Sequence, residues 1–426
     1  MKKTFSFCEY IRWVFFSLIL LLPTSATARV YIDITSFDSR VPIAVANFTS
    51  DPGLAAIIRS DLEFTHAFVI ANPEAYLESS AAPFHPENWL PLSVEAVLKG
   101  SVSFDKSGQR LVAEAALYDP VENKTLFKRQ YQSDVTLLRS LGHQISNDVY
   151  QALTDQESVF RTRLAYVVED GGNKDIHIMD WDGGRSRRIT RAKTLTLSPR
   201  WAPSGRYMAY SSLRGGKWGI YLLDLSQAKE RLLYGGSSLG IPGSFTPNGS
   251  GLFFSASERG ESKIFQVDLD GSHVKKITDT IGIDVSPSVS PDSRQIAFVS
   301  DRGGTPQVYI MNDRGGQARR ITFEGRYNTS PVWSPRGDRI AFVGRADGGL
   351  QIFTISPNGD GLTQLTSGGN NDNPSWSPDG RYIAYAASGG GDSVIQIMLA
   401  NGQKKRRISP LGQKASAPNW SPWFRF

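Results

Sequence analysis

A possible nucleophilic serine is the first feature of the sequence that could support catalysis. Residues 236–240 read G-S-S-L-G and match the G-x-S-x-G turn that exposes the catalytic serine of α/β-hydrolases. That turn joins a strand to a helix, whereas here the segment leads toward another strand-like stretch without a helical pattern. We therefore interpret the match as coincidental and predict no catalytic residues.

The histidines and a set of aspartates also indicate no catalytic or metal-binding site. The five histidines are His66, His85, His143, His177 and His273. No two have the spacing of a metal-binding pair, no phosphate loop or dinucleotide fingerprint occurs, and we predict neither metal nor cofactor. His143 lies on an expected helix, where we predict a half-buried structural residue. Asp292, Asp338 and Asp379 each follow a Ser-Pro pair, where aspartate favours a turn.

Residues 1–28 have the pattern of an export signal. A basic start at residues 2–12 precedes an apolar run at residues 14–22 and an A-x-A site at residues 26–28. The apolar run is too short to span a bilayer, so we expect cleavage after Ala28, a periplasmic location and no direct membrane insertion. The only cysteine, Cys8, falls in the removed segment, which leaves no disulfide and no thiol nucleophile in the mature chain.

A repeat of about 44 residues dominates residues 161–426. A residue of aromatic or apolar type, followed by a small residue and proline, stands at Trp201, Phe245, Val289, Trp333, Trp376 and Trp420, in steps of 44, 44, 44, 43 and 44 residues. Each unit contains strand-length segments between glycine-rich turns, which is the hairpin pattern. Those turns would break the helices of a solenoid. Four short strands per unit are the size of a propeller blade, and we predict an all-β six-bladed propeller.

The two ends of the repeat predict how the ring closes. Residues 163–168 begin the first unit without a preceding Trp-Ser-Pro motif, and residues 418–422 carry that motif with no unit after it. We expect the C-terminal strand to complete the first blade, because closure removes the free sheet edges of the ring.

Residues 29–160 lack the repeat and are expected to form an α/β domain. A helix is predicted after residues 51–53, and a second over residues 136–153 has apolar residues at helical spacing. Strands are predicted at residues 41–48, 94–102, 111–118 and 126–131.

Twelve positions that lead into the innermost strands are the candidate partner-binding residues. Loops presented together on a rigid scaffold usually carry binding, and the mostly small or polar side chains suit a mouth that receives a partner's segment. Ordinary solvent-exposed loops are the alternative. The twelve are Leu197, Ser198, Leu239, Ile241, Asp284, Ser286, Thr329, Ser330, Asp372, Asn373, Ser416 and Ala417.

Charge points to no particular ligand. The chain carries a formal net charge of +6, and the only dense basic run is residues 404–407. Similar basic segments recur in other repeats, so we interpret the run as a solvated strand edge and predict no binding to nucleic acid.

The combination of these features resembles the TolB family, periplasmic components of the Tol-Pal system. The sharper points of likeness are residues 40–45, 143–145, 148–150, 162–167 and 419–422. The resemblance implies a scaffold, monomeric within a multiprotein complex, that binds the peptidoglycan-associated lipoprotein Pal at the propeller mouth. It also implies a TolA-like inner-membrane-linked partner on the N-terminal side and a role in outer-membrane integrity during cell constriction.

The sequence departs from the family pattern at a few positions. Phe245-Thr246-Pro247 and Val289-Ser290-Pro291 replace the aromatic-Ser-Pro form, and Leu239 and Ser286 stand where bulkier polar groups are expected at the rim. These departures put individual partner contacts in doubt but leave binding of Pal in general as expected.

The competing class is an enzyme, a propeller-containing periplasmic hydrolase that cleaves peptides or polysaccharides. A peptidase of this type would need a C-terminal α/β-hydrolase domain, and four residues follow Pro422. We therefore expect a protein that is not an enzyme.

Overall fold

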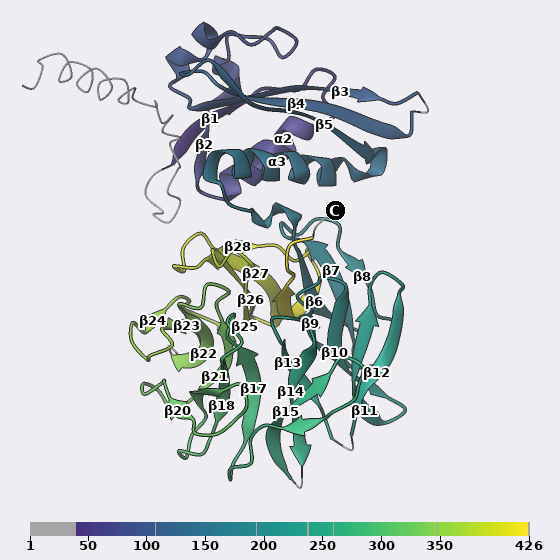
Figure 1. Ribbon diagram of the computed structural model, residues 1–426, viewed down its shortest axis with the longest axis vertical. Helices are drawn as coiled ribbons and strands as arrows, with labels where there is room; N and C mark the ends of the chain where they lie inside the picture. Colours follow the sequence, from purple (N-terminus) through teal and green to yellow (C-terminus); the bar gives the residue numbers. More distant parts are fainter. Residues whose placement is uncertain are drawn as a thin grey trace, which may run out of the picture.

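The computed structural model describes residues 40–424 except 107, 193, 237, 259 and 347. It consists of an α/β domain stacked on one end of a β-propeller (Figure 1). The expected export signal lies outside the described residues. Among the residues that are described, none of the helices is long and apolar enough to cross a membrane.

The α/β domain is built on a five-stranded sheet with the order β2-β1-β3-β4-β5. The central strand β1 (Val41–Val45) pairs in parallel with β2 (Phe68–Ile70) and β3 (Ala96–Phe104). Strands β4 (Arg110–Asp119) and β5 (Lys124–Asp134) continue from β3 as an antiparallel meander. Strand β2 was not predicted, because it has three residues and only one buried side chain, Phe68.

Two helices, α2 (Leu54–Phe64) and α3 (Leu138–Thr154), pack together beneath this sheet. The Asp51 carboxylate accepts hydrogen bonds from the first amides of α2, which satisfies donors that the helix itself cannot. The helices approach closely at Gly142, where a Cβ atom would lie 2.6 Å from the Ile57 side chain. Short 3-10 segments are Pro73–Ala75, Pro86–Asn88, Leu90–Leu92, Val135–Leu137 and Val159–Arg161.

Six four-stranded antiparallel sheets form the propeller, as predicted. The first blade consists of β29 (Lys414–Trp420), β6 (Arg163–Asp170), β7 (Asn173–Asp180) and β8 (Arg187–Arg188). The second contains β9 (Thr196–Trp201), β10 (Tyr207–Arg214), β11 (Lys217–Asp224) and β12 (Lys229–Gly235). The third contains β13 (Ile241–Phe245), β14 (Gly251–Glu258), β15 (Glu261–Asp268) and β16 (Lys275–Lys276). The fourth contains β17 (Asp284–Val289), β18 (Gln295–Ser300), β19 (Gln307–Asn312) and β20 (Arg319–Arg320). The fifth contains β21 (Asn328–Trp333), β22 (Ile340–Ala346), β23 (Gly349–Ile355) and β24 (Thr363–Gln364). The sixth contains β25 (Asn370–Trp376), β26 (Tyr382–Gly389), β27 (Asp392–Leu399) and β28 (Arg406–Arg407).

The C-terminal strand closes the ring, which confirms the prediction from the repeat. Strand β29 pairs antiparallel with β6, and Trp420 lies opposite Leu164. The Trp420 indole donates to Thr162 Oγ1 at 2.8 Å, and the Arg163 amide donates to Ser421 Oγ at 2.9 Å. The first blade therefore joins segments from both ends of the propeller sequence.

Local hydrogen bonds hold the turns after Ser290-Pro291 and Ser377-Pro378. The Ser290 hydroxyl donates to Asp292 Oδ1 at 2.5 Å, and the Arg381 amide donates to Asp379 Oδ1 at 3.0 Å. Hydrogen bonding within the turn lowers the pKa of Asp292. These aspartates are turn residues, as predicted from their position after Ser-Pro.

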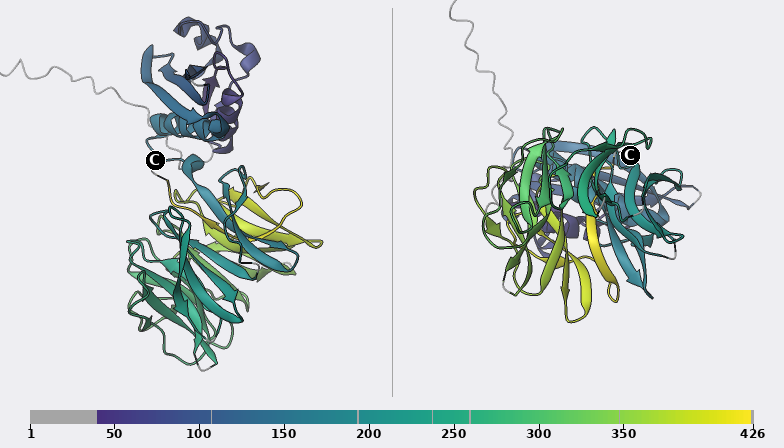
Figure 2. Two further views of the ribbon diagram at one scale, coloured as in Figure 1. Left: turned by 90° about the vertical axis from the view of Figure 1, so that its right-hand side faces the viewer. Right: turned by 90° about the horizontal axis from the view of Figure 1, so that it is seen from below.

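The α/β domain lies against one side of the ring (Figure 2). It shares a continuous apolar core with the first and sixth blades. Phe64 of α2 lies 4.5 Å from Trp181 and 5.1 Å from Tyr382, measured between ring centroids. Phe160, in the connection between the domains, lies 5.2 Å from Trp181. Buried aromatic side chains thus attach the α/β domain to one sector of the ring.

Candidate binding site in the propeller channel

The innermost strands β9, β13, β17, β21, β25 and β29 surround the channel and share one direction. Their aromatic ends face the α/β domain, because Trp420 and the neighbouring Tyr382 belong to the core that both domains share. The strand starts therefore lie at the opposite opening, which we call the distal mouth. The connections between blades run across this face, since each leads from an outermost strand to the next innermost one.

Eleven of the twelve predicted residues lie within these innermost strands and only Leu239 lies in a connection. The expectation that they occupy loops ahead of the strands is therefore wrong for all but Leu239. The strands begin earlier than predicted because pairing with the second strand of each blade continues past the proline.

A β-bulge interrupts the innermost strand at the same position in five blades. Ser198, Ser286, Ser330, Asn373 and Ala417 have φ between 48° and 56°, a left-handed conformation that is uncommon for residues other than glycine. Each lies where the pairing register shifts, and bulges of this kind re-aim neighbouring side chains. The bulge thus separates two groups of predicted residues.

The first group lines a cavity of about 510 Å³ in the channel. Its members among the predicted residues are Ser198, Ile241, Ser286, Ser330 and Asn373. The cavity extends from these residues to the prolines of the Trp-Ser-Pro motifs, and all six blades contribute to it. The other seven predicted residues, which include the bulge residue Ala417, do not line this cavity, and Ile241 is the only residue at a strand start that does.

Asp284 is fully buried, so it cannot serve as a rim residue that meets a partner directly. Its exposed fraction is 0%, and its carboxylate accepts a hydrogen bond from Arg302 at 2.9 Å. Thr280 also donates to it, at 3.2 Å. A buried charge needs such pairing, and the structure assigns Asp284 to the support of the rim.

The distal mouth carries exposed apolar side chains that the sequence analysis missed. Ile281, Phe323 and Leu411 are 89%, 71% and 86% exposed and lie in three different connections between blades. Ile283 and Tyr327, in two of the same connections, are also exposed. A large apolar residue in a short connection that also contains a glycine was the available signal, but only the tertiary structure reveals the exposure.

The serine of the G-x-S-x-G match has no catalytic setting. Ser238 Oγ donates to the Ser257 carbonyl at 3.0 Å, and strand β13 follows, not a helix. A nucleophile needs a base within hydrogen-bond reach, and the described residues place no histidine in a hydrogen bond with Ser238.

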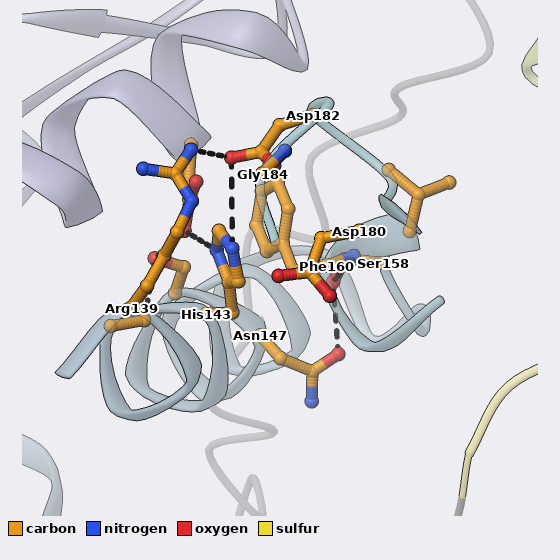
Figure 3. A network of polar contacts seen from close by, with 12 residues as sticks. Arg139, His143, Asn147, Ser158, Phe160, Asp180, Asp182 and Gly184 are labelled. Atoms are coloured by element: carbon orange, nitrogen blue, oxygen red, sulfur yellow. Dashed lines mark hydrogen bonds and ion pairs between the residues drawn. The ribbon is translucent and has the colours of Figure 1, made fainter. Parts of the chain in front are cut away.

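A second polar cluster joins the α/β domain to the propeller (Figure 3). His143 Nδ1 lies 2.8 Å from Asp61 Oδ2 of α2, and His143 Nε2 lies 3.6 Å from Asp182 Oδ2 in the turn after β7. Arg139 pairs with Asp182, and Ser146 donates to Asp61 at 2.7 Å. His143 is 4% exposed, so the expectation of a half-buried residue is wrong.

The three acidic and imidazole groups of this cluster are types that also bind metals. The donor atoms of Asp61, His143 and Asp182 lie within 4.8 Å of one another. However, the two ring nitrogens face different carboxylates, and Arg139 and Ser146 already bind carboxylate oxygens. The arrangement suits an ion-pair network better than a metal site.

Opposing effects act on the pKa of His143. Burial lowers it, but the hydrogen bond and charge of Asp61, together with the charges of Asp182 and Asp180, outweigh burial and raise it above its ordinary value. The protonated ring can then donate toward both carboxylates. In its protonated form the ring links the two domains through Asp61 and Asp182.

Two family models match the chain. The model described as TolB beta propeller domain matches residues 150–424, and the model described as TolB amino-terminal domain matches residues 30–126. The chain belongs to the TolB family. Its six blades and α/β domain are the two parts that these models describe.

Individual TolB proteins show how far the likeness extends. The Tol-Pal system proteins TolB of Dechloromonas aromatica and Bordetella avium are 32% identical over 206 and 217 residues. The matches cover 47% and 49% of this chain and 48% and 49% of those proteins, so the chain spans about half the length of the curated relatives it matches. The crystal structure of TolB from Acinetobacter baumannii, 28% identical, superposes with a TM-score of 0.82 over 90% of this chain and 97% of that one.

Proposed function

We propose that this protein is a non-enzymatic binding component of the Tol-Pal system in the periplasm. Membership of the TolB family and the names of its relatives support the assignment to this system. The export-signal pattern of residues 1–28 supports the location. A binding role is favoured over a hydrolytic one because Ser238 and the turn aspartates have structural hydrogen bonds.

In this proposal Pal binds at the distal mouth. The observation that carries it is the group of exposed apolar side chains, Ile281, Phe323 and Leu411, around the starts of the innermost strands. Interfaces combine apolar anchors with a polar surround. Half-buried Thr329, Asp372 and Ser416, near the starts of innermost strands, supply polar groups at the same mouth.

The N-terminal side of the molecule would engage a TolA-like protein linked to the inner membrane. The α/β domain packs near the aromatic ends of the innermost strands, away from the strand starts at the distal mouth, so both partners can bind at once. A scaffold that connects them would help to maintain outer-membrane integrity during constriction. The protein would act as a monomer within this complex.

Capture of Pal by single arginine variants tests the docking surface. Phe323→Arg, Thr329→Arg and Asp372→Arg add charge at the mouth without removing a buried ion pair. At least one should weaken Pal binding tenfold or more, about 1.4 kcal/mol, while the melting temperature stays unchanged. Asp284→Arg is unsuitable because it would leave Arg302 unpaired inside the blade.

Val121→Arg is the matched control. Val121 is 72% exposed and lies on the α/β domain, so the same change there should leave Pal capture intact. Normal capture by all three mouth variants would place the Pal site elsewhere.

A further inference from the structure

One level of the channel presents a ring of equivalent side chains from all six blades. These residues immediately precede the aromatic or apolar residue of each Trp-Ser-Pro motif, and every one lines the channel cavity. They are Arg200, Ser244, Ser288, Val332, Ser375 and Asn419. We call this set the channel ring; five of its six members carry hydrogen-bond donors.

Four members use their oxygen atoms to bind the next blade. Ser244, Ser288 and Ser375 each accept, through Oγ, the backbone amide of the following blade's motif residue at 2.9 Å. Asn419 Oδ1 accepts the Trp201 amide at 2.7 Å. The hydroxyl and amide hydrogens remain, and they have no acceptor within the part of the chain that the structure describes.

Arg200 adds a positive charge to this level. Its Nε donates to the Gly243 carbonyl at 2.7 Å and its Nη1 to the Pro199 carbonyl at 2.9 Å. Among the described residues no carboxylate pairs with it, and it is the only charged side chain that lines the cavity. Burial lowers the pKa of Arg200 to about 10, so the guanidinium remains charged at neutral pH.

Arg200 is a half-buried cation surrounded by spare donors, and no negatively charged acceptor lines the cavity among the described residues. A guanidinium forms its strongest hydrogen bonds with carboxylates or phosphates. The channel ring would disfavour a cation for the same reason.

We propose that the channel ring is a carboxylate-binding site, with Arg200 as the counter-ion and Ser244, Ser288 and Ser375 as hydroxyl donors. The cavity of about 510 Å³ has the size of a site for a small organic molecule, about 300–1,000 Å³. Proline and tryptophan side chains around the ring suit the apolar part of such a ligand. The carboxylate belongs either to a free small acid or to an acidic residue of a peptide that enters the channel. The channel ring lies on the far side of the bulges from the strand starts, so substitutions in the ring leave the exposed apolar residues of the distal mouth in place.

Calorimetric titration at low chloride tests the site with three probes: acetate, the blocked peptide acetyl-Gly-Glu-Gly-amide and its glutamine counterpart. We expect the wild-type protein to bind acetate, the glutamate peptide or both, and to bind the glutamine peptide at least tenfold more weakly. Binding of acetate identifies a free acid as a sufficient ligand, whereas binding of the glutamate peptide alone identifies a peptide carboxylate.

Arg200→Gln should weaken the binding of the carboxylate probe at least tenfold. Glutamine can still donate to the Gly243 carbonyl, which favours folding of the variant. Arg314→Gln is the matched control, since Arg314 is exposed and outside the cavity, and it should bind as the wild type does. Ser288→Ala and Ser375→Ala, which keep Arg200 in place, should each weaken binding twofold to tenfold and provide the test if Arg200→Gln does not fold. Unchanged binding by these variants, or no binding of either carboxylate probe by the wild type, would overturn the proposal.

Discussion

His143 connects three elements that are distant in the sequence. It lies on α3, its Nδ1 contacts the carboxylate of Asp61 on α2, and its Nε2 faces the carboxylate of Asp182 on the propeller. Arg139 and Asp180 complete the charged surroundings. Because the charged form of the ring is the one that both carboxylates stabilise, protonation and contact between the domains are coupled.

The raised pKa of His143 predicts a pH-dependent stability. A group whose pKa is higher in the folded than in the unfolded state stabilises the fold fully below its unfolded pKa, about 6.5. This stabilisation is lost as the pH rises through the folded-state pKa. The free energy of unfolding, measured by denaturant titration, should therefore fall as the pH rises above about 6.5.

His143→Gln should remove that component of the pH dependence. It should also lower the free energy of unfolding at mildly acidic pH by about 3–5 kcal/mol, the cost of breaking a buried ion pair by deleting one partner. His273→Gln is the control, because the His273 side chain is 83% exposed and should contribute little. An equal pH slope in wild type and His143→Gln would contradict this role.

At the scale of elements, hydrogen bonds between neighbouring innermost strands hold the blades in register. The Trp420 amide binds Ser375 of the sixth blade, and Asn419 binds the Trp201 amide of the second. Strand β29 thus joins the two blades on either side of it as well as β6 within its own blade.

Trp420→Ala tests the closing strand. The side chain is 5% exposed and its indole is bonded to Thr162, so the change should lower the free energy of unfolding by about 3–5 kcal/mol. Thermal denaturation and size-exclusion chromatography should show lower stability and some association through the loosened edge. Trp218→Ala, in the partly exposed β10–β11 hairpin, should cost less. Equal losses in the two variants would argue against a special role for β29.

At the scale of the whole molecule, the α/β domain and the ring are thermodynamically coupled through aromatic packing. Trp181 is 1% exposed and lies between Phe64 and Phe160. Domains that share a buried apolar contact of this kind resist independent motion.

Trp181→Ala should uncouple the two domains. Loss of a buried tryptophan costs about 3–5 kcal/mol, and here the loss falls on the contact between domains. Scanning calorimetry should resolve two unfolding transitions where the wild type has one. A single transition at the wild-type temperature would contradict the coupling.

The sequence alone determined the propeller, its six blades and its closure, because a motif that recurs every 43 or 44 residues specifies one supersecondary unit. It also determined most of the α/β domain, since β1, β3, β4, β5 and both helices have clear apolar periodicity. It did not determine β2, which is too short for a periodic pattern.

Only the tertiary structure decided which side chains meet. The sequence predicts Asp284 to be a polar rim residue, yet Arg302 pairs with it inside the blade. Asp61 contacts His143, which is 82 residues away in the sequence. The channel ring depends on six blades whose corresponding residues converge on one axis, and on bulges that separate it from the strand starts. Local propensity sets the strands, but the packing of blades and domains determines the environment of each polar group.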